Sequence, residues 1–263
     1  MRRGTMFWGG ILVILGLVFL LDNLGFFGNI NIWGLIWPLF LIALGAWIIW
    51  GRFFSSSAES EHASVPMEGA SQARIRINHG AGRIKISAHD EPGVLIEGDF
   101  GGGLDIQTRR DGERLDVKMS VQTQILPFSW YPGYSLDWNF TLNKGIPLAI
   151  ELNTGASDNR IDLSELKVSE VKLSSGASAT NLTLPANAGY TRLDVESGAA
   201  SVDISVPPGV AARIRSRSWL SSLNLDNARF PRLGDAYQST DYDDATNKVD
   251  VYLQMGAGSV TVY

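Results

Sequence analysis

The phrases "SSGASATNLTLP" at residues 174–185 and "ESGAASVDISVP" at residues 196–207 decide the fold. Each contains a Gly-Ala pair, then apolar residues that alternate with polar ones, then a proline. A catalytic loop is normally written once in a chain, whereas a structural unit recurs as often as the core needs it. The duplication therefore indicates a repeated structural element.

The Gly-Ala pair recurs along the second part of the chain. The copies are Gly80 and Ala81, Gly155 and Ala156, Gly176 and Ala177, Gly198 and Ala199, and Gly256 and Ala257. A degenerate copy has Trp219 and Leu220 instead, and positions 155, 176, 198 and 219 are 21 or 22 residues apart. We expect each pair to form a sharp corner, because glycine tolerates a positive φ and alanine adds little bulk where corners stack.

Residues 72–263 are predicted to form an all-β domain. Stretches such as "ARIRIN" (73–78), "RLDVES" (192–197) and "KVDVYL" (248–253) alternate apolar and polar residues, as strands with one buried face do. Because so short a unit cannot bury its apolar face alone, the spacing favours a β-solenoid of stacked strand pairs. The alternation also allows a β-sandwich of hairpins. Since copies 80 and 256 depart from the regular spacing, the ends should be irregular, with the last strand, "GAGSVTVY", closing one end.

Residues 1–54 are predicted to form a transmembrane helical hairpin with spans at 6–21 and 32–50. Both segments are apolar, and the second is long enough to cross a hydrocarbon core of about 30 Å. The first is not followed by a small-x-small cleavage site, so we expect a retained helix rather than a signal peptide. The positive-inside rule, applied to Arg2, Arg3 and Arg52, places both termini and the β domain in the cytoplasm. Residues 55–71, rich in Ser, Ala and Glu, are expected to be a flexible linker.

The composition excludes several kinds of partner and site. The formal net charge is −5, and a phosphate backbone requires a basic face, so nucleic acid is not expected. The chain has no cysteine, which excludes disulfides, thiolate metal sites and a cysteine nucleophile.

The few chemically interesting residues predict neither a metal site nor catalysis. His62, His79 and His89 lack a close metal-ligand spacing, and the acidic run with Asp241, Asp243 and Asp244 lacks the Gly and Glu of an EF-hand loop. Outward carboxylates occur all along the strands, so they do not single out a glycosidase pair. They include Asp162, Glu165, Asp194, Glu196 and Asp203. No nucleophile motif or phosphate-binding loop is visible, so we expect no catalytic residues and no cofactor.

An aromatic segment at residues 125–140 is the most unusual part of the chain. Phe128, Trp130, Tyr131 and Tyr134 lie among prolines and a glycine, which suits either a partner surface or a cover over one end of the stack. Trp138, which continues the segment in an alternating pattern, can equally belong to a strand core.

Two sets of motifs carry a family likeness. The segment "WPLFLIALG" resembles the LiaI–LiaF-like transmembrane module of bacterial envelope-stress proteins. The phrases "IPLAIELNTGAS", "RIDLSEL", "VKLSSGAS" and "DYDDATNKVDVYLQMGAGSVTVY" are similar to toast-rack/LiaF-type C-terminal β domains. Longer members of that family have about four membrane helices, whereas this chain has two apolar segments.

The resemblance implies a non-enzymatic protein of the bacterial cell membrane. In the best-known members the implied role is an accessory of a sensor histidine kinase that responds to envelope damage, so the expected partners are the lipid bilayer and such a kinase. An outward-facing adhesin-like or glycan-binding module is the alternative.

Overall fold

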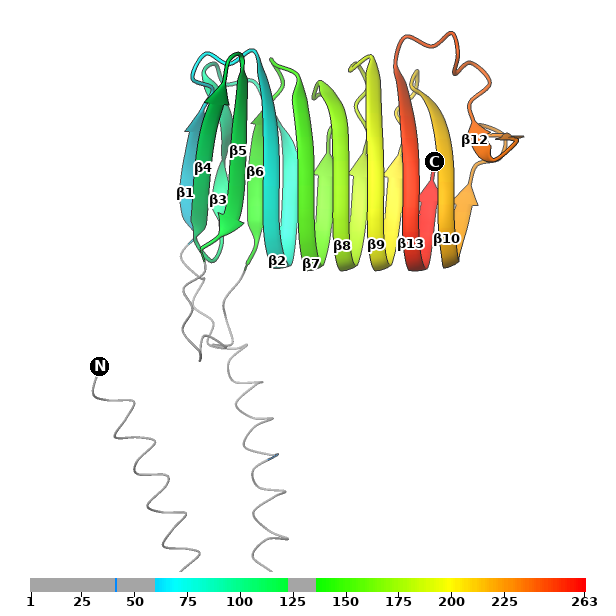
Figure 1. The fold of residues 1–263 in the computed structure, drawn as a ribbon, viewed down its shortest axis with the longest axis horizontal. Coiled ribbons are helices and arrows are strands. Elements are labelled where there is room, and N and C mark those ends of the chain that lie inside the picture. Colours follow the sequence, from blue (N-terminus) through cyan, green and yellow to red (C-terminus); the bar gives the residue numbers. More distant parts are fainter. Residues whose placement is uncertain (1–40, 42–59, 123–135) are drawn as a thin grey trace, which may run out of the picture. The chain divides into compact units, whose positions relative to one another are not determined.

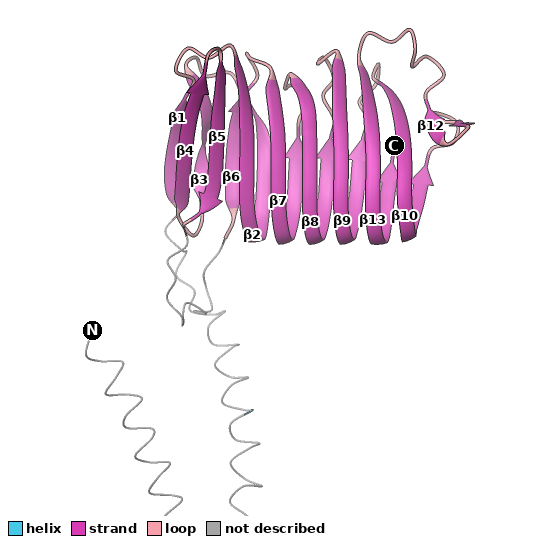
Figure 2. Cartoon of the chain, in the orientation of Figure 1, coloured by secondary structure: helices cyan, strands magenta, loops and turns pink. Residues whose placement is uncertain are grey.

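The structure is a computed structural model that describes residue 41, residues 60–122 and residues 136–263. The chain divides into two compact units, Met1–Ser55 and Ser56–Tyr263. The expected membrane hairpin lies, apart from residue 41, outside the described residues, and within the described part no helix has the length and apolarity of a membrane span. The described part of the second unit contains strands, turns and loops (Figure 2).

The all-β prediction is confirmed, since thirteen strands join in one sheet within the described residues. Their bounds are β1 Glu61–Pro66, β2 Gln72–His89, β3 Val94–Phe100, β4 Leu104–Asp111, β5 Arg114–Val121, β6 Trp138–Asn143, β7 Leu148–Asp162, β8 Val168–Thr183, β9 Tyr190–Ser205, β10 Ala211–Leu225, β11 Arg232–Leu233, β12 Ala236–Gln238 and β13 Lys248–Val262. The Gly-Ala pairs lie inside β2, β7, β8, β9 and β13 and therefore do not separate two strands.

Six long strands form a parallel stack in the order β2-β7-β8-β9-β13-β10. Each one bends near its middle and folds back, so that its two halves belong to two facing layers (Figure 1). The register is continuous through the bend, with Ala156 paired with Ala177 and Ala177 with Ala199. Hairpins join antiparallel strands, so the parallel pairing of the long strands excludes the alternative sandwich of hairpins.

The last strand is not at an end of the stack, contrary to expectation. β13 lies between β9 and β10, pairing in parallel with both. The end position belongs to β10, whose other neighbour is the short β12, paired at Arg213 and Ile214.

The opposite end of the stack is irregular, as expected for the copy at Gly80. The first half of β2 pairs with β5, which in turn pairs with β4. Its second half pairs with β6, which pairs with β3, and β3 pairs with β1. The two layers are thus extended by separate strands, of which β5 and β6 run parallel to β2 and the strands beyond them pair antiparallel.

The prediction of a flexible linker at residues 55–71 is wrong for residues 61–66, which form β1. These residues pair with β3 from Glu61 opposite Phe100 to Pro66 opposite Val94. Main-chain hydrogen bonds to β3 hold the segment, and Val65 is buried. With few apolar residues in the segment, its side chains gave little sign of a strand.

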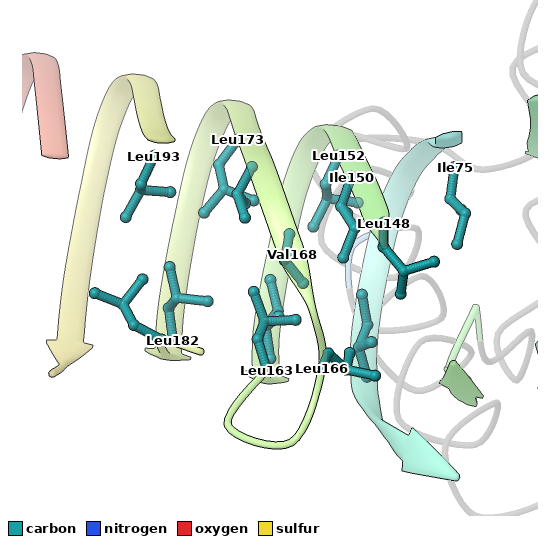
Figure 3. Close-up of a cluster of buried hydrophobic side chains, with 14 of the residues drawn as sticks. Ile75, Leu148, Ile150, Leu152, Leu163, Leu166, Val168, Leu173, Leu182 and Leu193 are labelled. Carbon is teal, nitrogen blue, oxygen red and sulfur yellow. The ribbon is translucent and has the colours of Figure 1, made fainter. Parts of the chain in front are cut away.

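The core fills the space between the two layers. Inward residues from both halves of successive strands pack against one another, as Leu152, Leu173 and Leu182 do in Figure 3. Trp138 and Phe140 of β6 are each 1% exposed, so the alternating end of the aromatic segment is core.

Candidate functional site

The glycines of the repeat form a row across the stack, in which each approaches the backbone of the one before. A Cβ built on Gly155 would lie 2.4 Å from the carbonyl oxygen of Gly80. The corresponding distances are 2.8 Å for Gly176 to Gly155, 2.7 Å for Gly198 to Gly176 and 2.7 Å for Gly256 to Gly198. A side chain has no room at these four positions, because the strands meet too closely at the bend.

The prediction that these glycines are required because they adopt a positive φ is wrong. None of the five has a positive φ, whereas Gly189 and Gly209, in the loops that join successive long strands, have φ values of 74° and 80°. Left-handed backbone is therefore needed in those loops. Close approach requires glycine at four of the five bends, whereas Gly80 has open space where a Cβ would lie.

A groove of about 1130 Å³ runs along this glycine row. One wall is formed by outward residues, most of them two positions before a glycine of the row. They are Asn78, Asn153, Ser174, Glu196 and Gln254, with Ser120 of β5 and Arg217 of β10 in the neighbouring strands. Because the strands are in register, these side chains form one row across seven strands.

The two ends of this row differ in how their polar groups are satisfied. Asn153 Nδ2 donates to Asn78 Oδ1 at 3.2 Å. At the other end, no hydrogen-bond or ion-pair partner is found among the described residues for the side chains of Glu196, Gln254 and Arg217. All three side chains are exposed and are available to a ligand.

Sequence reasoning missed this row, although a signal was present. By alternation alone, Glu196 is one of many outward carboxylates. Aligning the copies on their glycines puts Asn153, Ser174 and Glu196 at the same position of the repeat, two residues before the glycine.

A second polar cluster fastens the segment between β10 and β13 to the stack. Tyr190 Oη donates to Asp250 Oδ2 at 2.9 Å, and the Arg213 guanidinium lies 4.0 Å from the centroid of the Tyr242 ring. Although Tyr190 is 49% exposed, partial burial, followed by the hydrogen bond to Asp250, raises the pKa of Tyr190 to about 12. Burial likewise raises the pKa of Tyr242. The cluster is therefore held by neutral tyrosines over a wide pH range.

The three histidines considered as metal ligands lie apart from one another. His62 is exposed and lies 3.1 Å from Asp99, whose hydrogen bond raises the pKa of His62. His79 is 2% exposed beside the bend, with its ring centroid 4.9 Å from that of Trp138, and burial lowers its pKa. His89 Nδ1 accepts the backbone N–H of Glu91 in the turn after β2. They show no geometry for shared metal binding, and no potential metal cluster occurs in the described ranges.

The acidic run before β13 forms a turn. The carbonyl oxygen of Asp241 accepts the backbone N–H of Asp244 at 3.2 Å and that of Ala245 at 2.9 Å. Asp243 pairs with Arg213 at 3.3 Å. These groups are engaged in local structure.

The outward carboxylates are distributed over separate features. Asp162 accepts the backbone N–H of Ser164 at the end of β7, and Glu165 lies 3.7 Å from Lys144. Asp194 and Glu196 are in the first half of β9, and Asp203 is in its second half. The structure does not gather these five carboxylates at one place.

The predicted aromatic surface, Phe128, Trp130, Tyr131 and Tyr134, lies outside the described residues.

Comparisons with known proteins agree with the two-part organisation. Residues 6–49 match the LiaI-LiaF-like transmembrane region, and residues 54–205 match the N-terminal domain of toast_rack, DUF2154. No match was found among the curated proteins.

One solved structure supports the fold. A candidate cell adhesion protein from Clostridium sporogenes aligns with a TM-score of 0.70 and 21% identity, over 77% of this chain and 97% of that one. A candidate adhesin from Bacteroides fragilis aligns over 79% of this chain and 98% of that one, but its TM-score of 0.25 and 8% identity are too low to support an argument. Because the toast_rack match extends over more than half of the chain, the chain belongs to the toast_rack family and carries a LiaI-LiaF-like transmembrane region ahead of that domain.

Proposed function

We propose that the chain is a non-enzymatic, membrane-anchored envelope protein that regulates cell-envelope stress signalling through protein contacts. The observation that carries this proposal is the order of the two matched regions, a LiaI-LiaF-like transmembrane region at 6–49 followed by a toast_rack domain at 54–205. The membrane region anchors the protein, and the β unit provides the surface for regulation.

The β unit suits a role in presenting a fixed surface. Its long strands pair in register over both layers, and its core side chains are almost fully buried. Closely packed interiors deform little, so residues on the outer faces keep their mutual distances when a partner binds. The proposed partner is a membrane sensor histidine kinase, contacted on the cytoplasmic side that Arg2, Arg3 and Arg52 favour.

The alternative is an outward-facing adhesin-like or glycan-binding module. It is favoured by the similarity of the fold to the candidate cell adhesion protein of Clostridium sporogenes and by the polar groove along the glycine row. This function requires the β unit on the outer side of the membrane.

Topology and signalling output separate the two functions. A reporter active only in the cytoplasm, fused after Tyr263, should be active if the protein regulates a kinase. Deleting the gene should then change the output of an envelope-stress promoter, and chemical crosslinking of the full-length protein in cells should capture a histidine kinase. An inactive cytoplasmic reporter together with unchanged promoter output would contradict the regulatory function and support the adhesin-like one.

A further inference from the structure

The insertion of β13 keeps an acidic strand and a basic strand apart. On the outer face of the first layer, β9 carries Asp194 and Glu196, and β10 carries Arg215 and Arg217. Direct pairing of β9 with β10 in the same register would place these acids opposite these arginines.

Instead, residues of β13 stand between the two strands. Tyr252 is paired with Asp194 on one side and Arg215 on the other, and Gln254 is paired with Glu196 and Arg217. Adjacent strands are about 4.8 Å apart, so the backbone positions of each acid and its arginine are about 10 Å apart.

Of these two pairs, Glu196 and Arg217, beside the groove, form the one without a partner among the residues that the structure describes. Asp194 binds Arg192 at 2.8 Å, and Arg215 Nη1 donates to the hydroxyl of Tyr252 at 3.1 Å. Glu196, Gln254 and Arg217 have no such partner among the described residues, and all three are exposed and line the groove. The row thus offers a carboxylate, an amide and a guanidinium in succession beside a floor of glycines.

We propose that this end of the groove binds a short, extended peptide by its two free ends. The ammonium group lies on Glu196, the carboxylate on Arg217, and a peptide group of the ligand on the Gln254 amide between them. An extended chain rises about 3.4 Å per residue, so a peptide of three residues spans the separation of about 10 Å. The site does not rest on the regulatory function proposed above.

The charge pattern selects this ligand over simpler ones. A lone anion would be attracted by Arg217 and repelled by Glu196, and a lone cation would experience the reverse. A neutral sugar chain would leave both charges without a counter-charge. A zwitterionic peptide satisfies both, and the glycines at Gly198 and Gly256 let its backbone lie close to the floor.

Isothermal titration calorimetry on the full-length protein in detergent tests the site with trialanine as the probe. Trialanine should bind, and N-acetyl-trialanine amide, which lacks both charges, should bind about three- to ten-fold more weakly, as expected for two solvent-accessible ionic contacts. Absence of trialanine binding, or equal binding of the capped peptide, would overturn the proposal.

Charge variants add a test of geometry. Glu196→Gln and Arg217→Gln should each weaken trialanine binding about two- to three-fold, while Asp203→Asn, in the second half of β9, should leave it unchanged. The double variant Glu196→Arg, Arg217→Glu should restore binding, because the peptide can lie in the opposite direction. Circular dichroism checks that each variant is folded. Unchanged binding in both single variants, or failure of the folded double variant to recover binding, would refute the assignment.

Discussion

Replacing Gly155 by alanine should destabilise the β unit, whereas the same change at Gly80 should not. Both glycines occupy the bend of a long strand, and neither has a positive φ. They differ in their surroundings. A Cβ on Gly155 would lie 2.4 Å from the carbonyl oxygen of Gly80, while one on Gly80 would meet no atom within 4 Å.

The size of the effect follows from this contact. Carbon and oxygen in close non-bonded contact are normally about 3.3 Å apart or more, so β7 must move by several tenths of an ångström from β2 at the bend. Overpacking of this kind costs about 1–3 kcal/mol. At Gly80, alanine restricts the unfolded chain without a clash, which stabilises by about 0.4–1 kcal/mol. The two variants should therefore differ in free energy of unfolding by about 1.4–4 kcal/mol.

Thermal unfolding of the full-length protein in detergent, followed by the β signal in circular dichroism, measures the difference. For a unit of this size, 1 kcal/mol shifts Tm by about 2–4 °C, so the Gly155→Ala protein should melt about 3–16 °C below the Gly80→Ala protein. Equal destabilisation in both variants would mean that backbone conformation, and not contact with the preceding strand, requires glycine. Equal stability in both would mean that the strands separate at no cost, and the explanation would fail.

Three further tests probe other parts of the fold by urea unfolding. Thr180→Val removes the hydroxyl acceptor that lies 3.0 Å from Asn159 Nδ2 in the core and should lower the free energy of unfolding by about 1–3 kcal/mol. Adding Asn159→Leu should recover part of this loss, because no buried donor is then left unpaired. No recovery would contradict the role given to this hydrogen bond. Trp138→Ala should cost about 3–5 kcal/mol, because the side chain is 1% exposed, and a loss below 1 kcal/mol would show that β6 contributes little to the core. Burial and Asp250 raise the pKa of Tyr190 to about 12 from an unfolded value of 10.0, so its stabilising contribution is complete below pH 10 and is lost as the pH rises through about 12. Tyr190→Phe should flatten the decline in stability between pH 10 and 12, and an unchanged decline would exclude Tyr190 as its source.

The sequence contains strong local signals for the strands and their bends. Alternation of apolar and polar residues specifies which side chains enter the core, and Ile75, Leu173 and Leu193 are all buried as that pattern predicts. The spacing of the Gly-Ala pairs predicts equivalent positions such as Ala156 and Ala177, which are paired in the structure. Both signals depend on residues close together in the chain.

β1 and the groove depend on interactions that local patterns do not record. The segment Glu61–Pro66 is held by main-chain pairing with β3, and main-chain groups are alike in every residue. The groove requires the register between strands, which brings Glu196 and Gln254, 58 residues apart in the chain, to the same level of adjacent strands. The sequence shows the chemistry of each residue, but local patterns do not show which residues lie beside it in the fold.

The position of β13 is a different case, because the composition of the strands contains information that repeat spacing lacks. Parallel strands with the same inward pattern can stack in any order that their connections allow, and the long connection after β10 lets the last strand return past it. An inner strand is covered by a neighbour on both sides, so a fully apolar inward face contributes more to stability there than in an end strand. At the level where β13 places the buried Leu253, β10 has the polar Ser216. The strand with the poorer apolar face therefore occupies the end, and ranking the copies by their inward residues, rather than by their order in the chain, would have placed β13 inside the stack.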